Sequence, residues 1–233
     1  MNKKLAEDLV PSPKNSPLWN VDDAGDNHLS VSSETPMRKE PAMLTEDQKI
    51  DRIECLFREI METLGLDLSD DSLQGTPKRV AKMYVREIFS GLNPENMPEM
   101  TLFENGYRYD QMLVEKDIAV HSHCEHHFVP ISGKAHIAYI SSGKVIGLSK
   151  LNRLVDYYAR RPQVQERLTV QIAQALQKVL NTADVAVLVD ARHHCVSSRG
   201  IKDANASTIT TFYGGVFSDA GRKEEFLKYI SFS

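Results

Sequence analysis

The amino-acid sequence predicts an α+β fold, because helix-like and strand-like segments are grouped along the chain rather than alternating regularly. Two helix-like segments come first, followed by strands, two more helices, further strands and a closing helix. Hydrophobic residues make up 41% and charged residues 26% of the 233 residues, which is typical of a soluble globular protein. The sequence contains neither an internal repeat nor a glycine-rich phosphate-binding loop.

The two leading helices are predicted from capping residues and apolar spacing. Thr45 and Gln48 have the spacing of a capping box, and apolar residues recur behind them at helical intervals. Cys55 lies in this helix, and we interpret it as a small buried hydrophobic residue. Thr76 and Pro77 are expected to begin the second helix as its N-cap and first-turn proline.

The later elements are predicted from apolar runs and from the residues that interrupt them. Ser149 is the expected cap of a third helix, and Pro162 is expected to end it and begin a fourth. The fourth helix carries an apolar stripe from Val164 to Val179. A short helix is expected over 222–230, and strands are expected over residues 112–120, 134–140, 185–189 and 207–213.

Composition excludes several classes of protein. The net charge is −4 and the pI is near 6.1, so no basic excess indicates nucleic-acid binding. No apolar run approaches the ~20 residues that a membrane span needs, and the first residues show no secretory signal. Three cysteines are too few for a disulfide scaffold, so we expect a reducing, cytoplasmic location and cysteines that bind metal or act in catalysis.

Three regions are expected along the chain. Residues 1–42 hold five of the ten prolines and few apolar residues, so we expect a disordered or loosely attached tail, with Met43 as a conceivable second start. Residues 43–100 are expected to form an N-terminal helical region. Residues 101–233 are expected to form the domain that carries the chemistry.

Six of the eight histidines fall in two short windows, and each window contains a cysteine. Cys124 and His127 are separated by two residues, a spacing that lets a thiolate and an imidazole reach one metal ion. Cys195 lies in the second window and supplies a third ligand. Three ligands leave a position for water, as in catalytic zinc sites, whereas a structural site would take a fourth ligand from His194, His126 or His123. Both alternatives are open at this point.

Two histidines remain beside the proposed ligands. His126 and His193 could donate or accept protons near the metal, because histidine titrates near neutral pH. The alternative is that they only support the ligands or lie on the surface.

Charged residues gather around the third and fourth helices. Lys150 and Arg153 share a helix face, and with Arg199 they could hold a polyphosphate. Charge alone favours the alternative of a solvated face. Glu166 could be an exposed charge, or it could accept two hydrogen bonds from an edge such as that of guanine.

Five segments together resemble the GTP cyclohydrolase I family, over about residues 45–230: 76–84, 124–127, 147–153, 161–168 and 193–200. The resemblance implies the tunnelling fold, an antiparallel sheet with two helices packed on one side, preceded by an N-terminal helical region. It also implies a homodecamer of two stacked pentamers, with active sites between subunits.

The resemblance further implies Zn²⁺ on Cys124, His127 and Cys195, and GTP as the substrate. The reaction it implies converts GTP and water to 7,8-dihydroneopterin triphosphate and formate, the first step of pterin and tetrahydrofolate biosynthesis. The implied roles are proton transfer by His126 and His193, action near the ribose by Ser149 and Gln165, guanine binding by Glu166, and triphosphate binding by Lys150, Arg153, Arg199 and a neighbouring subunit's Arg79.

Two other functions compete with this interpretation. A zinc-stabilised oligomer that binds a purine or pterin without turnover would need four protein ligands, and the presence of His126, His193, Ser149 and Glu166 together argues against it. Another tunnelling-fold enzyme, such as a nitrile reductase acting on a deazaguanine, would use a cysteine nucleophile and a nicotinamide. The three zinc-type ligands and the basic cluster fit that chemistry poorly.

Overall fold

The computed structural model describes residues 32–39 and 44–231. Residues 33–233 form one compact unit, and the other unit, Met1–Ser32, lies outside the described residues except for Ser32. The predicted tail is therefore described only at 32–39, and Met43 also lies outside the described residues.

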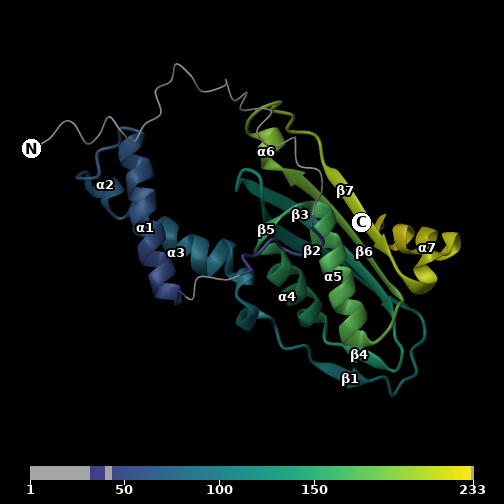
Figure 1. Ribbon diagram of the computed structural model, residues 1–233. Helices are drawn as coiled ribbons and strands as arrows, with labels where there is room; N and C mark the ends of the chain where they lie inside the picture. Colours follow the sequence, from purple (N-terminus) through teal and green to yellow (C-terminus); the bar gives the residue numbers. More distant parts are fainter. Residues whose placement is uncertain (1–31, 40–43, 232–233) are drawn as a thin grey trace, which may run out of the picture. The chain divides into compact units, whose positions relative to one another are not determined.

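The centre of the described fold is a five-stranded sheet in the order β5-β2-β3-β6-β7. Neighbouring strands are antiparallel, except that the short β5 runs parallel to β2. Helices α4 and α5 cover one face of this sheet (Figure 1), which confirms the predicted α+β class and the tunnelling-fold arrangement. The bounds are β2 Met112–Cys124, β3 Pro130–Ile140, β5 Pro162–Gln163, β6 Val185–His193, β7 Thr208–Tyr213, α4 Leu148–Ala159 and α5 Gln165–Leu180.

The main core lies between the sheet and these two helices, and it follows from the alternation of side chains along the strands. In β3, Ala135, Ile137 and Tyr139 face α4 and α5, whereas Ala138 faces the opposite side. On that opposite side a smaller cluster forms around Phe217 of η4 (Gly215–Ser218) and Phe226 of α7 (Ala220–Ser231). The predicted C-terminal helix is therefore confirmed.

The N-terminal helices are α1 (Glu46–Thr63), α2 (Asp71–Gln74) and α3 (Thr76–Met83). The capping box of Thr45 and Gln48 is present, so the predicted start of α1 is confirmed. Gly75 rather than Thr76 is the N-cap of α3, and the helix continues as a π-helix, η1 (Tyr84–Ile88). Cys55 is exposed, so its interpretation as a buried residue is wrong.

Two predicted boundaries of the later helices are also wrong. Gly147 is the N-cap of α4, and Ser149 lies inside the first turn without capping it. Pro162 lies in β5 rather than beginning a helix, because α5 starts only at Gln165, after Val164 as N-cap.

The short elements complete the description. They are η2 (Ser90–Leu92), η3 (Pro94–Asn96), α6 (His194–Ser197) and the two-stranded pair of β1 (Leu102–Glu104) with β4 (Lys144–Ile146). Among the described residues, no helix combines the length and the apolar character that crossing a membrane would require.

Candidate active site

Strands β2 and β6 end at the same edge of the sheet. Each pairs antiparallel with β3, so the two strands are parallel to each other. Cys124 is the last residue of β2, and Cys195 lies in α6, which follows β6 directly. The topology therefore brings together two cysteines that are 71 residues apart in the sequence.

Cys124, His127 and Cys195 form a cluster whose potential ligand atoms all lie within 4.8 Å of one another. Of the described residues, only these three belong to the cluster. His194 is directed elsewhere, with Nε2 3.0 Å from the Ser132 hydroxyl. Two thiolates and one imidazole are a donor set that suits zinc, so the residues fit the implied ion.

The Cys195 thiol is partly buried beside the Cys124 thiol. Burial, together with the neighbouring Cys124 thiol, raises the pKa of the Cys195 thiol. A thiol must lose its proton to bind a metal, so metal binding at this cluster releases protons.

Two histidines lie beside the cluster. Nδ1 of His126 is 3.6 Å from Sγ of Cys124, and Nε2 of the same ring is 3.9 Å from the Glu125 carboxylate. His193, the last residue of β6, is half-buried. Burial lowers the pKa of His193, and the negative charge of Glu166 opposes that shift.

The orientation of His193 is set by Gln165, the first residue of α5. Nε2 of the Gln165 amide donates to the carbonyls of Val189 and Thr208, so its Oε1 is the acceptor. That oxygen lies 2.8 Å from Nε2 of His193, which must therefore be the donor. Nδ1 is the ring nitrogen that Gln165 does not contact. Gln165 is buried, so the structure places it as the support of His193.

Arg199 and Glu166 lie near the same edge of the sheet. Arg199 donates a hydrogen bond to Nε2 of His127 over 3.1 Å. Glu166 is exposed in the first turn of α5, directly after Gln165.

Four of the predicted site residues do not reach this cluster within one chain. Ser149, Lys150 and Arg153 lie in the first half of α4, while the end of α4 leads into β5 beside Cys124. Lys150 precedes the last residue of α4 by nine positions, or about 14 Å along the helix axis. Arg79 of α3 bonds to the Ser72 carbonyl and the Thr76 hydroxyl.

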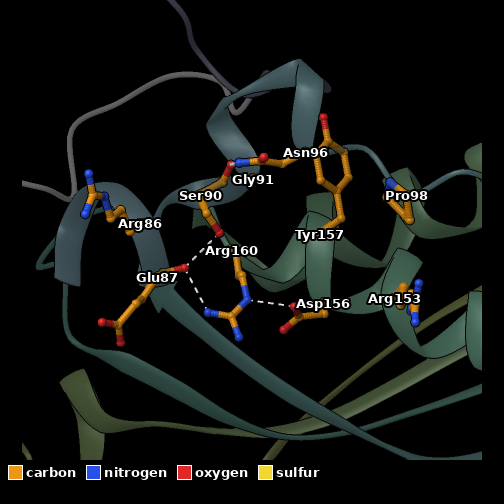
Figure 2. Close-up of a pocket in the computed structure, with 10 residues that line it drawn as sticks. All are labelled: Arg86, Glu87, Ser90, Gly91, Asn96, Pro98, Arg153, Asp156, Tyr157 and Arg160. Atoms are coloured by element: carbon orange, nitrogen blue, oxygen red, sulfur yellow. Dashed lines mark hydrogen bonds and ion pairs between the residues drawn. The ribbon is translucent and has the colours of Figure 1, made fainter. Parts of the chain in front are cut away.

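Arg153 instead lines a pocket of about 560 Å³ (Figure 2). Arg160 in this pocket donates to the Asp156 carboxylate over 2.7 Å and to the Glu87 carbonyl over 2.8 Å. Gly91 forms part of the pocket wall.

Sequence reasoning assigned no role to Glu125 or Arg167, which form an ion pair beside the cluster. Nη1 of Arg167 lies 2.6 Å from Oε2 of Glu125, and the Arg167 side chain is only 2% exposed. The signal for this pair was the arginine itself, which directly precedes Leu168 of the apolar stripe of α5. A buried charge requires a partner, but the sequence does not say which.

Comparisons with known proteins agree with one another. The family model described as GTP cyclohydrolase I matches residues 53–231. A GTP cyclohydrolase 1 from Flavobacterium johnsoniae is 57% identical over 210 residues, which cover 90% of this chain and 94% of the relative. The protein of the same name from Yersinia pseudotuberculosis is 54% identical over 203 residues, covering 87% of this chain and 91% of the relative.

A third relative and one solved structure complete the comparisons. The GTP cyclohydrolase 1 of Aeromonas salmonicida is 56% identical over 185 residues, covering 79% of this chain and 85% of the relative. A crystal structure of the archaeosine synthase QueF-Like in the apo form aligns with 45% of this chain and 95% of that chain, at 21% identity and a TM-score of 0.38. That last likeness is too low to bear on function.

Proposed function

The chain belongs to the GTP cyclohydrolase I family, and from that premise we propose that it is a zinc-dependent hydrolase converting GTP and water to 7,8-dihydroneopterin triphosphate and formate. This reaction is the first step of pterin and tetrahydrofolate biosynthesis, and we assign it to the cytoplasm. The observation that carries the proposal is the convergence of Cys124, His127 and Cys195, with two histidines beside them.

Cys124, His127 and Cys195 are the residues that would hold zinc. A zinc ion there supplies a Lewis acid that makes water a competent nucleophile at neutral pH. Within the described residues, the cluster has three members rather than four, which favours a catalytic site over a purely structural one. This observation also argues against the non-enzymatic zinc-stabilised oligomer.

The two histidines supply the proton transfers. C8 of guanine is a poor electrophile, and a proton given to N7 makes it resemble an iminium carbon that water attacks. We assign this proton to Nδ1 of His193 or to His126. Gln165 stays bonded to Nε2 of His193 throughout, so the ring keeps its orientation in both protonation states. The imidazole ring of guanine then opens, and a second hydrolysis releases C8 as formate.

The remaining residues bind the two ends of the nucleotide. Glu166 accepts hydrogen bonds from N1–H and the 2-amino group of guanine. Ser149 acts near the ribose, which rearranges and recloses on the free amines, and Gln165 acts there through the His193 ring that it orients. The triphosphate is held by cationic residues, which fixes C8 beside the metal: Lys150, Arg153, Arg199 and Arg79.

The site requires more than one subunit. Ser149, Lys150 and Arg153 lie toward the opposite end of α4 from the cysteine cluster, so those of a neighbouring subunit would complete the site. Exposed apolar side chains on α1 and at its C-cap offer a surface for assembly, since Leu56 is 48%, Ile60 52% and the C-cap Leu64 72% exposed. The number of subunits follows from the family resemblance, on which we propose a homodecamer of two pentamers.

The decisive experiment is turnover of GTP by the purified chain. We expect a product that fluoresces as neopterin after oxidation and dephosphorylation, together with one formate per GTP. Thorough removal of metal with a chelator should abolish turnover, and added zinc should restore it. Turnover that survives complete metal removal would refute the zinc mechanism.

A second prediction concerns recognition of guanine. Glu166→Ala should raise the KM for GTP about 10-fold or more, since a hydrogen bond to a charged group contributes about 1.5–3 kcal/mol. It should also narrow the preference for GTP over inosine triphosphate, which lacks the 2-amino group. Steady-state kinetics with both nucleotides would test this. Glu224→Ala, an exposed substitution on α7, is the control and should change neither value. An unchanged preference in Glu166→Ala would remove Glu166 from the guanine site.

A further inference from the structure

The end of β2 and the loop that joins it to β3 carry two of the three proposed ligands, Cys124 and His127. It is closed by its own backbone, because Phe128 donates to the Cys124 carbonyl over 2.8 Å and Cys124 donates to the Val129 carbonyl over 2.9 Å. A third backbone bond ties it to β5, since Glu125 donates to the Gln163 carbonyl over 3.0 Å. These bonds fix the path of the main chain at the loop, while the side chain of Glu125 is held separately.

The Glu125 carboxylate is bound by both terminal nitrogens of Arg167. Nη1 donates to Oε2 over 2.6 Å and Nη2 donates to Oε1 over 3.2 Å. This two-point contact sets the orientation of the carboxylate as well as its distance. The exposed fractions of the two side chains are 2% for Arg167 and 19% for Glu125, so water screens the pair weakly.

Arg167 is itself held rigidly. It lies on α5, one residue before Leu168 and five residues before Ile172. The side chains of Leu168 and Ile172 are fully buried in the main core. The position of the guanidinium is therefore fixed by the packing of α5 against the sheet.

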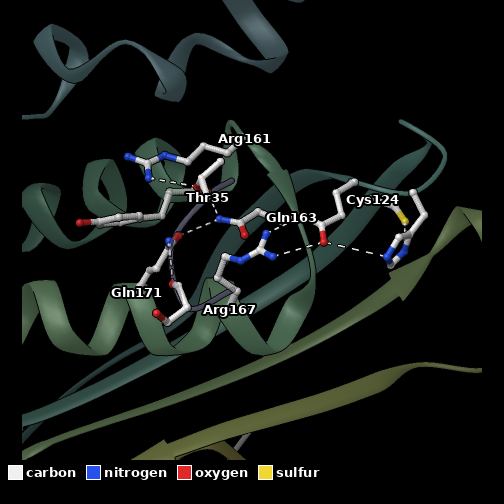
Figure 3. A network of polar contacts seen from close by, with 10 residues as sticks. Thr35, Cys124, Arg161, Gln163, Arg167 and Gln171 are labelled. Atoms are coloured by element: carbon white, nitrogen blue, oxygen red, sulfur yellow. Dashed lines mark hydrogen bonds and ion pairs between the residues drawn. The ribbon is translucent and has the colours of Figure 1, made fainter. Parts of the chain in front are cut away.

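The same face of α5 supports the loop at a second point. Gln171 lies four residues after Arg167, and its Oε1 accepts from Nε2 of Gln163 over 3.0 Å. Gln163 pairs with Cys124 across β5 and β2. On its other side, Nε2 of Gln171 donates to the Ser33 carbonyl, and Nη1 of Arg161 lies 3.5 Å from the Thr35 hydroxyl. Figure 3 shows this network between Thr35 and Cys124.

We propose that Arg167 is a positioning residue of the metal centre, which acts through Glu125 to hold Cys124 and His127 in the geometry that binds the ion. The proposal rests on the proposed function, because it presupposes that the cluster binds a metal. Arg167 contacts the Glu125 carboxylate, and Glu125 directly follows the proposed ligand Cys124 in the loop. Its effect is therefore on metal affinity and ligand geometry, and only through these on turnover.

The test measures metal binding by the full-length protein rather than activity. Arg167→Met should lower the affinity for zinc about 10- to 100-fold in competition with a chromophoric chelator, the loss typical when a group supporting a metal ligand is removed. In the cobalt-substituted protein, the thiolate-to-cobalt and ligand-field absorption bands should shift. Arg167→Lys should recover part of the affinity, because lysine keeps the charge but cannot contact both carboxylate oxygens.

Two further variants separate positioning from general stability. Ile172→Ala destabilises the same helix through the core without touching the loop, so it should keep the parent's zinc affinity and cobalt spectrum. The double variant Glu125→Gln with Arg167→Met leaves no unpaired buried charge, and it should still bind zinc weakly. If Arg167→Met alone fails to fold, the zinc affinity of the double variant tests the positioning role instead.

Parent-like affinity and spectrum in either Arg167→Met protein would overturn the proposal. An equal loss in Ile172→Ala would overturn it too, since the effect would then be one of stability. A parent chain that bound neither zinc nor cobalt would instead refute the proposed function, whatever the variants did.

Discussion

Cys195→Ser is expected to abolish metal retention and GTP turnover while leaving the fold intact. A serine hydroxyl is a poor zinc ligand. Losing the Cys195 thiolate therefore leaves only Cys124 and His127 in the cluster. The loss of affinity should exceed the about 10- to 100-fold expected for a group that only supports a ligand. Metal analysis of the purified variant, alongside the neopterin assay, would measure both effects.

The fold should survive this substitution because the core does not include the ion. The main cluster of buried side chains joins the sheet to α4 and α5, and Cys195 only packs against its edge. Measured without metal, the parent and the variant should unfold within about 1 kcal/mol of each other and elute at the same volume in size-exclusion chromatography. With metal, the parent alone gains stability by mass action.

Cys55→Ser is the matched control. Cys55 is the exposed cysteine on α1, so its substitution should change neither metal content nor turnover. Dissociation of Cys195→Ser into monomers would contradict the expectation that the assembly is independent of the ion. Full metal content in the same variant would contradict the ligand assignment.

The three residues of the proposed metal site can be recognised in the sequence because the pattern that marks them is local. A cysteine and a histidine two residues apart, and a second window with a third cysteine, need no knowledge of the fold to be recognised. Their convergence depends on β2 and β6 being parallel and ending at one edge of the sheet. Order of elements alone could not establish that arrangement.

The predicted strands stop short where they enter the site. The strand predicted over 112–120 extends to Cys124, and the one predicted over 185–189 extends to His193. In both cases the apolar pattern ends while the backbone pairing continues, because polar residues such as His123 and Arg192 replace apolar ones. Pattern reasoning fails most readily at the functional end of an element.

Cys55 shows a different limit. Successive residues of an α-helix are about 100° apart, so Ile50 and Met61, eleven residues apart, share a face. Both are buried. Cys55 follows Ile50 by five residues and lies about 140° around the helix, on the exposed side. The apolar residues of α1 were correctly recognised, but they occupy more than one face.

The pair of Arg167 and Glu125 could not have been predicted from spacing. The two residues are 42 positions apart and lie on different elements, so only the packing of α5 beside the loop joins them. The residue that caps α4 could not be predicted from the sequence either. A serine near the start of a helix is compatible with several cap positions.

Gly91→Ala is expected to destabilise the protein by about 1–3 kcal/mol, as overpacking of a close contact typically does. A Cβ at this position would lie 2.1 Å from the Tyr157 carbonyl oxygen and 2.8 Å from that of Arg160. Both are backbone atoms at the end of α4, which cannot move aside as a flexible side chain would. Figure 2 shows Gly91 close to Tyr157 in the pocket wall.

The contact matters because the backbone of Gly91 hydrogen-bonds the segment that follows η1 to the end of α4. Its N–H donates to the Arg160 carbonyl over 2.9 Å, and its own carbonyl accepts from Nε of Arg161 over 2.9 Å. Displacing this backbone weakens both bonds. At about 2–4 °C of Tm per kcal/mol for a chain of this size, the variant should melt about 2–12 °C below the parent by differential scanning calorimetry.

Gly106→Ala is the control that isolates the close contact from the loss of a glycine. A Cβ at Gly106 would meet nothing within 4 Å, and its φ is not positive, so alanine is tolerated there without strain. Alanine also has fewer unfolded conformations than glycine, so this variant should be neutral or slightly more stable. An equal fall of Tm in both variants would show that the approach of Gly91 to the end of α4 contributes nothing specific.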